Sequence, residues 1–199
     1  MFVIVRHGNT FERGEPPRRI GVRTDLPLTA AGHAQAEALG AHFAAQGMAF
    51  AKVLVSPLAR TRQTAEAILR HLPGSPSPLP CAWLREIDHG PDENAAEDAI
   101  LARIGAEALA AWDAQGVAPP GWEVDAEARI AAWQALFEEE KGPVLLVTSN
   151  GAARFALLAA GLVQGQESPS GLKLPTGGYG VIHRGERGGL TLAEWGVRP

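Results

Sequence analysis

The chain has 199 residues, of which 46% are hydrophobic and 20% are charged, a composition typical of a globular protein with one sizeable core. Its formal net charge of −4 argues against a general nucleic-acid binder, and its one cysteine, Cys81, excludes an intramolecular disulfide. We expect a single domain over residues 1–199, with no secretory leader and no membrane span, in the reducing cytoplasm.

The predicted elements alternate between strands and helices. In chain order we predict a strand over 2–5, a helix over 30–46 capped by Thr29, a strand over 52–55, a helix over 58–71, a surface loop over 73–80, helices over 93–112 and 125–139, a strand over 144–148 that leads into a helix, and a terminal hairpin with strands in 179–184 and 190–195. This order predicts an α/β fold, a three-layer α/β/α sandwich with a mostly parallel central sheet.

Charge is unevenly distributed along the chain. Through Arg62 there are eight Lys and Arg against four Asp and Glu, and the remainder has ten against eighteen. Five of the early cations are Arg6, Arg18, Arg19, Arg23 and Arg60. Guanidinium groups bind phosphate oxygens in bidentate fashion, so the amino-terminal third is suited to a small anionic ligand.

Polar motifs follow three of the predicted strands. They are "RHGNT" at 6–10, "SPLARTRQTA" at 56–65 and "TSNG" at 148–151, and a fourth segment, "WLREIDHGPDE", covers 83–93. Taken singly, each has a structural interpretation, such as a loop histidine or a helix start. Because ligands bind beyond the carboxyl ends of such strands, the motifs together place an imidazole among arginines opposite a carboxyl group. That combination suits phosphoryl transfer through a covalent histidine intermediate.

Four sequence blocks resemble those of the histidine phosphatase superfamily, whose fold is phosphoglycerate mutase-like. The blocks are "VIVRHGNT" at 3–10, "TDLPLTAAGHAQAEALG" at 24–40, "VLVSPLARTRQTAEAI" at 53–68 and "LREIDHG" at 84–90. The resemblance implies that His7 is the nucleophile and that Glu86 protonates the leaving oxygen. It also implies phosphate-binding positions at Arg6, Asn9, Thr10 and Arg60. Neutral imidazole, a protonated carboxyl group and fixed guanidinium groups fit that chemistry.

The chain departs from the family at "TSNG", where the family has Ser-His-Gly with a second histidine that donates to the phosphoryl group. Asn150 stands at that position. Replacing a charge-assisted hydrogen bond by a neutral one costs roughly 1–2 kcal/mol, or about tenfold in rate. We therefore expect a slowed enzyme in which Asn150 binds a phosphoryl oxygen. In the alternative interpretation Asn150 is a helix N-cap whose side chain faces backbone donors.

Two further groups are ambiguous. Asp88, His89, Asp92 and Glu93 lie close together, but their spacing favours a solvated acidic loop over a metal cluster, and we expect neither metal nor cofactor. Arg154 lies one turn after "TSNG", where a surface position is the simpler expectation. The three arginines at 18, 19 and 23 either close over a substrate or only decorate their loop.

The favoured function is metal-independent hydrolysis of a small phosphomonoester, with a small phosphorylated metabolite as the partner and no nucleic acid or membrane. Residues 86–98 include five carboxylates besides Glu86 and no Lys or Arg, which disfavours a bisphosphorylated mutase substrate. Two alternatives remain: a phosphoglycerate mutase-type phosphotransferase, and an impaired module that senses a phosphorylated ligand. The hairpin at 179–195 offers an edge strand for an oligomer, or simply an ordinary sheet edge.

Overall fold

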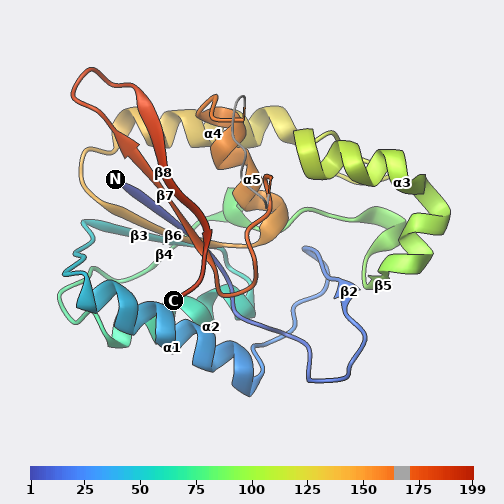
Figure 1. The fold of residues 1–199 in the computed structure, drawn as a ribbon, viewed down its shortest axis with the longest axis horizontal. Coiled ribbons are helices and arrows are strands. Elements are labelled where there is room, and N and C mark those ends of the chain that lie inside the picture. Colours follow the sequence, from blue (N-terminus) through green and yellow to red (C-terminus); the bar gives the residue numbers. More distant parts are fainter. Residues whose placement is uncertain (164–170) are drawn as a thin grey trace.

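A six-stranded sheet forms the centre of the protein in the computed structural model, which describes residues 1–163 and 171–199 (Figure 1). The strand order is β4–β3–β6–β1–β7–β8. The strands are β1 (Phe2–Arg6), β3 (Lys52–Val55), β4 (Leu79–Pro80), β6 (Val144–Thr148), β7 (Tyr179–Arg184) and β8 (Leu190–Val197). The first four run parallel, whereas β7 pairs antiparallel with β1 and with β8. The predicted mostly parallel α/β sheet and the terminal hairpin are confirmed.

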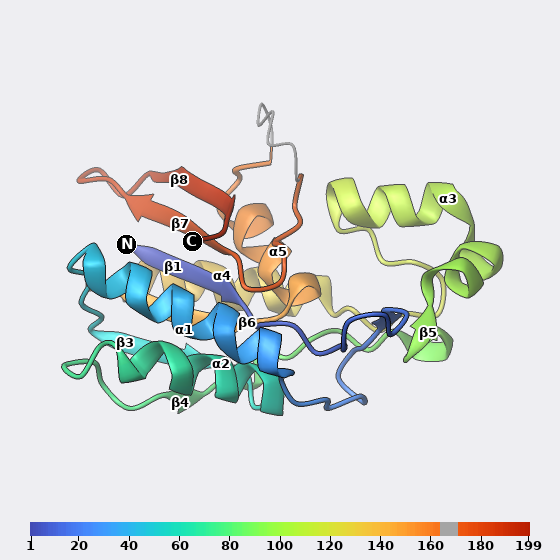
Figure 2. The same cartoon turned by 60° about the horizontal axis from the view of Figure 1, so that its bottom comes forward.

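Helices cover both faces of the sheet. Helices α1 (Ala30–Ala45) and α2 (Ala59–Arg70) lie on one face, and α4 (Ala126–Glu139) and α5 (Asn150–Ala159) lie on the other (Figures 1 and 2). Alternation along β1 explains the two cores, because neighbouring strand residues point to opposite faces. Val3 and Val5 pack in the cluster that includes α1 and α2, whereas Phe2 and Ile4 pack in the cluster that includes α4 and α5.

The predicted helix ends are close to the observed ones where a local signal exists. Thr29 is the N-cap of α1, and its hydroxyl accepts a hydrogen bond from the Gly32 N–H at 3.1 Å. The chain leaves this helix through Gly47, whose φ of 65° is in the left-handed region that favours glycine. Within the described residues, no helix is long and apolar enough to cross a membrane.

The predicted helix over 93–112 is wrong at both ends. Gly90–Asp92 form a 3₁₀ turn, and β5 (Ala95–Ala96) pairs antiparallel with β2 (Arg18–Arg19) in a separate two-stranded sheet. Helix α3 runs over Glu97–Gln115, is interrupted at Gly105, and stands beside the main sheet rather than over it (Figure 2). The carboxylates of Asp92 and Glu93 bind partners that are distant in sequence, and these contacts keep the first predicted residues out of the helix. Helical periodicity gives no information about such contacts. The predicted 73–80 loop likewise ends in the short strand β4.

Candidate active site

His7 follows β1, which lies inside the sheet between β6 and β7. Its backbone N–H donates to the Thr148 carbonyl at the end of β6, with an N···O distance of 3.0 Å. The carboxyl ends of β1 and β6 therefore bring the "RHG" and "TSNG" motifs together, as the sequence predicts. The imidazole is only 4% exposed.

The surroundings of the His7 ring fix its tautomer and keep it neutral. Nδ1 lies 2.8 Å from the Gly8 carbonyl oxygen, and because a carbonyl only accepts, Nδ1 carries the proton. The lone pair is then on Nε2. Burial lowers the pKa of His7 well below its ordinary value of 6.5, and the charges of Arg60 and Arg6 lower it further. A neutral imidazole at neutral pH is the form that can act as a nucleophile.

Two arginines give this strand end its positive charge. The Arg60 side chain is fully buried in the first turn of α2 and donates to the backbone carbonyls of Thr24 at 2.8 Å and Gly21 at 3.1 Å. Arg6 donates through Nη1 to the Leu174 carbonyl at 2.7 Å. Burial lowers the pKa of Arg6 to about 10, so its guanidinium is still cationic at neutral pH. Each arginine has a buried Nε without a hydrogen bond among the described residues.

Glu86 is held by two backbone amides. Its Oε1 accepts from the N–H of Ile87 at 3.0 Å, and its Oε2 accepts from the N–H of Gly151 at 3.1 Å. Burial raises the pKa of Glu86, but His89, these amides and Arg60 outweigh that effect, so the pKa lies below its ordinary value. In the ligand-free protein the Glu86 carboxyl group is therefore ionised at neutral pH. To protonate a leaving oxygen, however, Glu86 must first carry a proton. A bound phosphate dianion would raise this pKa, because a nearby negative charge favours the protonated form.

Asn9 and Thr10 follow His7 directly but differ in what their side chains do. The Asn9 amide donates to the carbonyl of Phe11 at 2.6 Å, so this side chain braces its own loop. Its backbone N–H donates to Gln35 Oε1 at 2.8 Å. Thr10 is 8% exposed. The geometry thus gives Asn9 a loop-forming contact that uses one N–H of its amide, and the phosphate-binding role of Asn9 stays a prediction.

Asn150 is the first residue of α5, and Ser149 is the N-cap. Asn150 is therefore not the N-cap, although its side chain does face a backbone donor, as that interpretation also expects. Its Oδ1 accepts a hydrogen bond from the backbone N–H of Leu174 at 2.9 Å. This contact leaves the two N–H groups of Nδ2 as the donors that a ligand can use.

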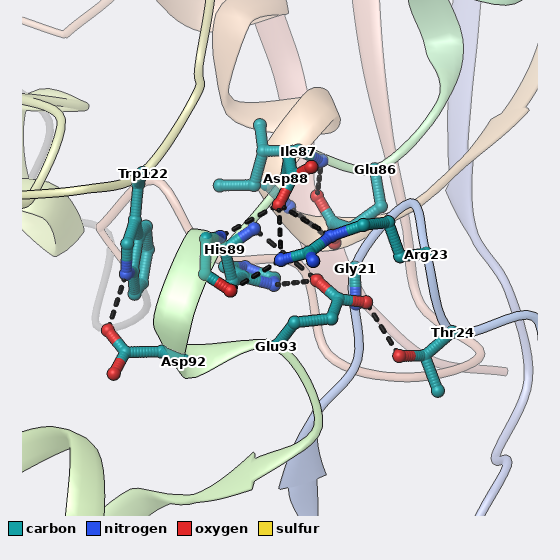
Figure 3. A network of polar contacts seen from close by, with 12 residues as sticks. Gly21, Arg23, Thr24, Glu86, Ile87, Asp88, His89, Asp92, Glu93 and Trp122 are labelled. Atoms are coloured by element: carbon teal, nitrogen blue, oxygen red, sulfur yellow. Dashed lines mark hydrogen bonds and ion pairs between the residues drawn. The ribbon is translucent and has the colours of Figure 1, made fainter.

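The acidic segment after Glu86 is not the solvated loop that the sequence favours (Figure 3). His89 and Asp92 are 4% and 3% exposed. Asp92 accepts from the Trp122 indole N–H at 2.7 Å and pairs with Arg103, while Asp88 accepts from Arg23 Nε at 3.0 Å. Among the described residues, no group of three or more His, Cys, Asp and Glu is arranged to hold a metal ion.

Glu93 links this segment to the loop that holds Arg60. Its Oε1 accepts from the Gly21 N–H at 2.8 Å and from the Thr24 hydroxyl at 2.6 Å (Figure 3). Burial raises the pKa of Glu93, but bonds from His89, Thr24 and Gly21 dominate and lower it to about 2. Gly21 and Thr24 are also the residues whose carbonyls accept from Arg60. This contact of Glu93 was not predictable from sequence, because only the folded chain brings Glu93 to this loop.

A cavity of about 330 Å³ lies beside part of the predicted site; His7, Asn9, Thr10 and Arg60 are not among its lining residues. Its walls include Arg6, Glu86 and Asn150 from the predicted site, together with residues of α3 and α5. Of the three arginines at 18, 19 and 23, only Arg19 lines this cavity, and all three pair with carboxylates: Glu15, Glu97 and Asp88, respectively. Arg154 also lines the cavity and is 0% exposed, so its expected surface position is wrong. The position of Arg154 within an Ala- and Leu-rich helical segment was the sequence signal that could have indicated its burial.

The sheet order and a buried histidine near two arginines define the class: an α/β sandwich with a cationic candidate site at the strand ends. The profile of the histidine phosphatase superfamily (branch 1) matches residues 2–197, and the chain belongs to that family. It is 29% identical over 190 residues to a 2,3-bisphosphoglycerate-dependent phosphoglycerate mutase of Mesorhizobium japonicum, covering 92% of this chain and 90% of that protein.

Solved structures extend the comparison. TTHB049 of Thermus thermophilus is 33% identical, with 92% of each chain covered and a TM-score of 0.66. The alpha-ribazole phosphatase of Shigella flexneri is 25% identical, with 99% of this chain and 96% of that chain covered and a TM-score of 0.70. The relatives thus include both a mutase and a phosphatase.

Proposed function

We propose that this protein is a metal-independent phosphatase that hydrolyses small phosphomonoesters through a phosphohistidine on His7. The observation that carries the proposal is the state of that ring: buried, neutral, and with Nδ1 hydrogen-bonded to Gly8 so that Nε2 holds the lone pair. Arg6 and Arg60 supply cationic donors beside it, and Asn150 offers its Nδ2 donors. These groups suit a transition state whose charge is spread over three equatorial oxygens.

The reaction has two steps. In the first, Nε2 of His7 forms a bond to phosphorus while the bond from phosphorus to the ester oxygen breaks, and protonated Glu86 gives its proton to the leaving oxygen. In the second, a water oxygen attacks the phosphohistidine, the N–P bond breaks, and the Glu86 carboxylate takes the water proton. In the ligand-free protein the pKa of Glu86 is lowered, which favours the carboxylate that the second step needs. The negative charge of the bound substrate raises this pKa and favours the protonated acid that the first step needs.

A mutase-type phosphotransferase is the second candidate, and the likeness to the Mesorhizobium enzyme favours it. The acidic segment is a weaker objection than the sequence suggests. Arg19 pairs with Glu97, Arg23 with Asp88 and Arg103 with Asp92, so most of that negative charge is neutralised. Isomerisation of phosphoglycerate that outpaces phosphate release would establish this candidate instead of the hydrolase.

The decisive experiment is phosphate release from p-nitrophenyl phosphate in the presence of a chelator, with His7→Ala as the comparison. We expect turnover in the native protein, loss of at least about 1,000-fold in the variant, and an acid-labile phosphoryl group on His7 in rapid-quench mass spectrometry. Chelator-resistant turnover that survives in His7→Ala would overturn the proposal. Binding of phosphate without turnover or phosphohistidine would identify the ligand-sensing module.

A further inference from the structure

A second cavity, of about 620 Å³, adjoins the 330 Å³ cavity of the candidate site. The two cavities share three wall residues: Arg6, Asp113 and Lys173. Arg6 is held at this boundary through its Nη1, which donates to the carbonyl of Leu174, a residue of the second wall. Under the proposed function Arg6 binds the phosphoryl group, so the second cavity lies one side chain away from the phosphate.

The walls of the two cavities differ in chemistry. Apart from the shared residues, most of the 330 Å³ wall is polar: Arg19, Glu86, His89, Glu97, Asn150 and Arg154. The 620 Å³ cavity adds residues without polar side chains: Ala110, Ala114, Gly171, Leu174 and Pro175. Such a wall favours an apolar ligand, because a polar group placed against it loses water and gains no hydrogen-bond partner.

The charged residues at the boundary are already paired with each other. Nζ of Lys173 lies 2.7 Å from Oδ2 of Asp113, and the two side chains are 52% and 32% exposed. The pair therefore neutralises the charge that the second cavity would otherwise offer to an anion. Because both side chains reach solvent, a flexible ligand can pass over them from one cavity to the other.

Helix α3 supplies one apolar side of the 620 Å³ cavity. Ala110 and Ala114 are one helical turn apart, so their methyl groups lie on the same face of α3, and both residues are exposed. A hydrocarbon group in the cavity would remove this surface from water, which is the main source of affinity for such a ligand. The volume is within the range of about 300–1,000 Å³ that is usual for small-molecule sites.

We propose that the 620 Å³ cavity binds an apolar extension of the leaving group, so that the preferred substrates are phosphomonoesters of alcohols that carry an alkyl chain or an aromatic ring. This inference rests on the proposed phosphatase function and adds the class of leaving group. In this arrangement the ester oxygen faces Glu86 in the 330 Å³ cavity, and the carbon chain extends past Lys173 to Ala110 and Ala114.

The test compares ethyl phosphate with hexyl phosphate. Their leaving oxygens have nearly the same basicity, so a difference in kcat/KM reports binding of the chain rather than reactivity. A fully buried methylene corresponds to about a fourfold gain, and we expect kcat/KM of the native protein to be at least about tenfold higher for hexyl phosphate. The double variant Ala110→Gln with Ala114→Gln puts two amides at the cavity wall and should abolish this preference while leaving kcat/KM for ethyl phosphate unchanged.

The double variant Ala102→Gln with Ala106→Gln is the matched control. These alanines are also exposed and four residues apart on α3, but neither lines the 620 Å³ cavity. The control should keep the native ratio of the two kcat/KM values. Thermal denaturation shows whether both double variants are folded, which their exposed positions favour.

Equal kcat/KM values for the two esters in the native protein, or an unchanged ratio in the Ala110 and Ala114 double variant, would overturn the inference. If that variant does not fold, calorimetry on the native protein decides, using ethylphosphonate and hexylphosphonate, which are not hydrolysed. We expect hexylphosphonate to bind at least about tenfold more tightly and with a more negative heat-capacity change, the mark of apolar burial. Equal affinities would refute the assignment.

The calorimetric measurement does not depend on turnover, which separates the two proposals. Tighter binding of hexylphosphonate together with absent or His7-independent hydrolysis would refute the phosphatase function and leave the apolar subsite in place. Hydrolysis that requires His7 but proceeds equally well with both esters would refute the apolar subsite alone.

Discussion

Gly151 and Glu86 are fitted to each other across the candidate site. The N–H of Gly151 donates to Oε2 of Glu86 at 3.1 Å, and a Cβ atom built on Gly151 would overlap Oε1 of the same carboxylate. The backbone of α5 therefore approaches the carboxylate as closely as it does because residue 151 has no side chain. The position of the candidate acid depends on this glycine.

Gly151→Ala should displace the Glu86 carboxylate and lower kcat for p-nitrophenyl phosphate by about 100-fold, within the usual range for acid–base catalysis. Gly74→Ala is the control, because a Cβ at Gly74 meets nothing within 4 Å. Steady-state kinetics measures the effect, and thermal denaturation shows whether the variants are folded. Native-like kcat in Gly151→Ala would show that Glu86 is not needed in this position.

The low pKa of His7 predicts the acidic side of the pH–rate profile. Burial and the two arginines favour the neutral ring, so the nucleophilic form persists at pH values below 6.5. We expect kcat/KM, corrected for ionisation of the substrate, to begin falling only well below pH 6.5. An acidic limb centred at or above that value would contradict the neutral nucleophile.

Two substitutions at Asn150 distinguish the role of its Oδ1 acceptor from that of its Nδ2 donors. Asn150→Ala loses the Nδ2 donor and the bond to Leu174, and we expect kcat/KM to fall at least about tenfold. Asn150→Asp retains an acceptor for the Leu174 N–H but puts a negative charge toward the phosphate, so its loss should be larger. Phosphatase assays on both variants provide the measurement, and unchanged turnover in Asn150→Ala would exclude a phosphate role for this residue.

The lowered pKa of Glu93 predicts that the free energy of unfolding depends on pH. Its pKa in the folded protein is about 2, below the ordinary value of 4.5. Its contribution is therefore complete above about pH 4.5 and is lost as the pH falls toward 2. We expect Glu93→Gln to lower the free energy of unfolding at pH 7 by about 1–3 kcal/mol and to flatten its dependence on pH across that window.

Denaturant titrations at pH 7, about pH 4.5 and about pH 3 measure these differences, because the contribution of Glu93 is lost below pH 4.5. Glu107→Gln, at an exposed position on α3, is the control and should leave the pH dependence unchanged. A Glu93→Gln curve parallel to that of the native protein would show that the contacts with Gly21 and Thr24 do not stabilise the ionised carboxylate.

The strands and the meeting of their ends were predictable from sequence, because buried β-branched runs and the Thr29 cap are local signals. The strand ends then fix where His7 and Asn150 lie. The segment from His89 to Ala96 was not predictable, since its conformation depends on Trp122, Arg103 and Thr24, which are distant in sequence. Periodicity describes a residue's neighbours on one element and contains no information on such partners.

Arg154 and Asn150 illustrate the same limit at the site. Helical spacing placed both residues on one face, but burial of Arg154 depends on Trp112 at the far end of α3. The choice of Leu174 as the partner of Asn150 depends on a segment that returns to the site only through the tertiary fold.

The location of β1 between two neighbouring strands has a consequence for how substrate preference can change. The candidate nucleophile His7 follows an interior strand of the sheet, whereas much of the cavity wall belongs to α3 and the segment around Lys173. Helix α3 stands beside the sheet and contributes only part of its length to the core (Figure 2). Under the proposed function, exchanges in α3 can therefore change which leaving group is accepted without altering the strands that carry His7 and Asn150, which makes α3 the natural segment to vary in directed evolution.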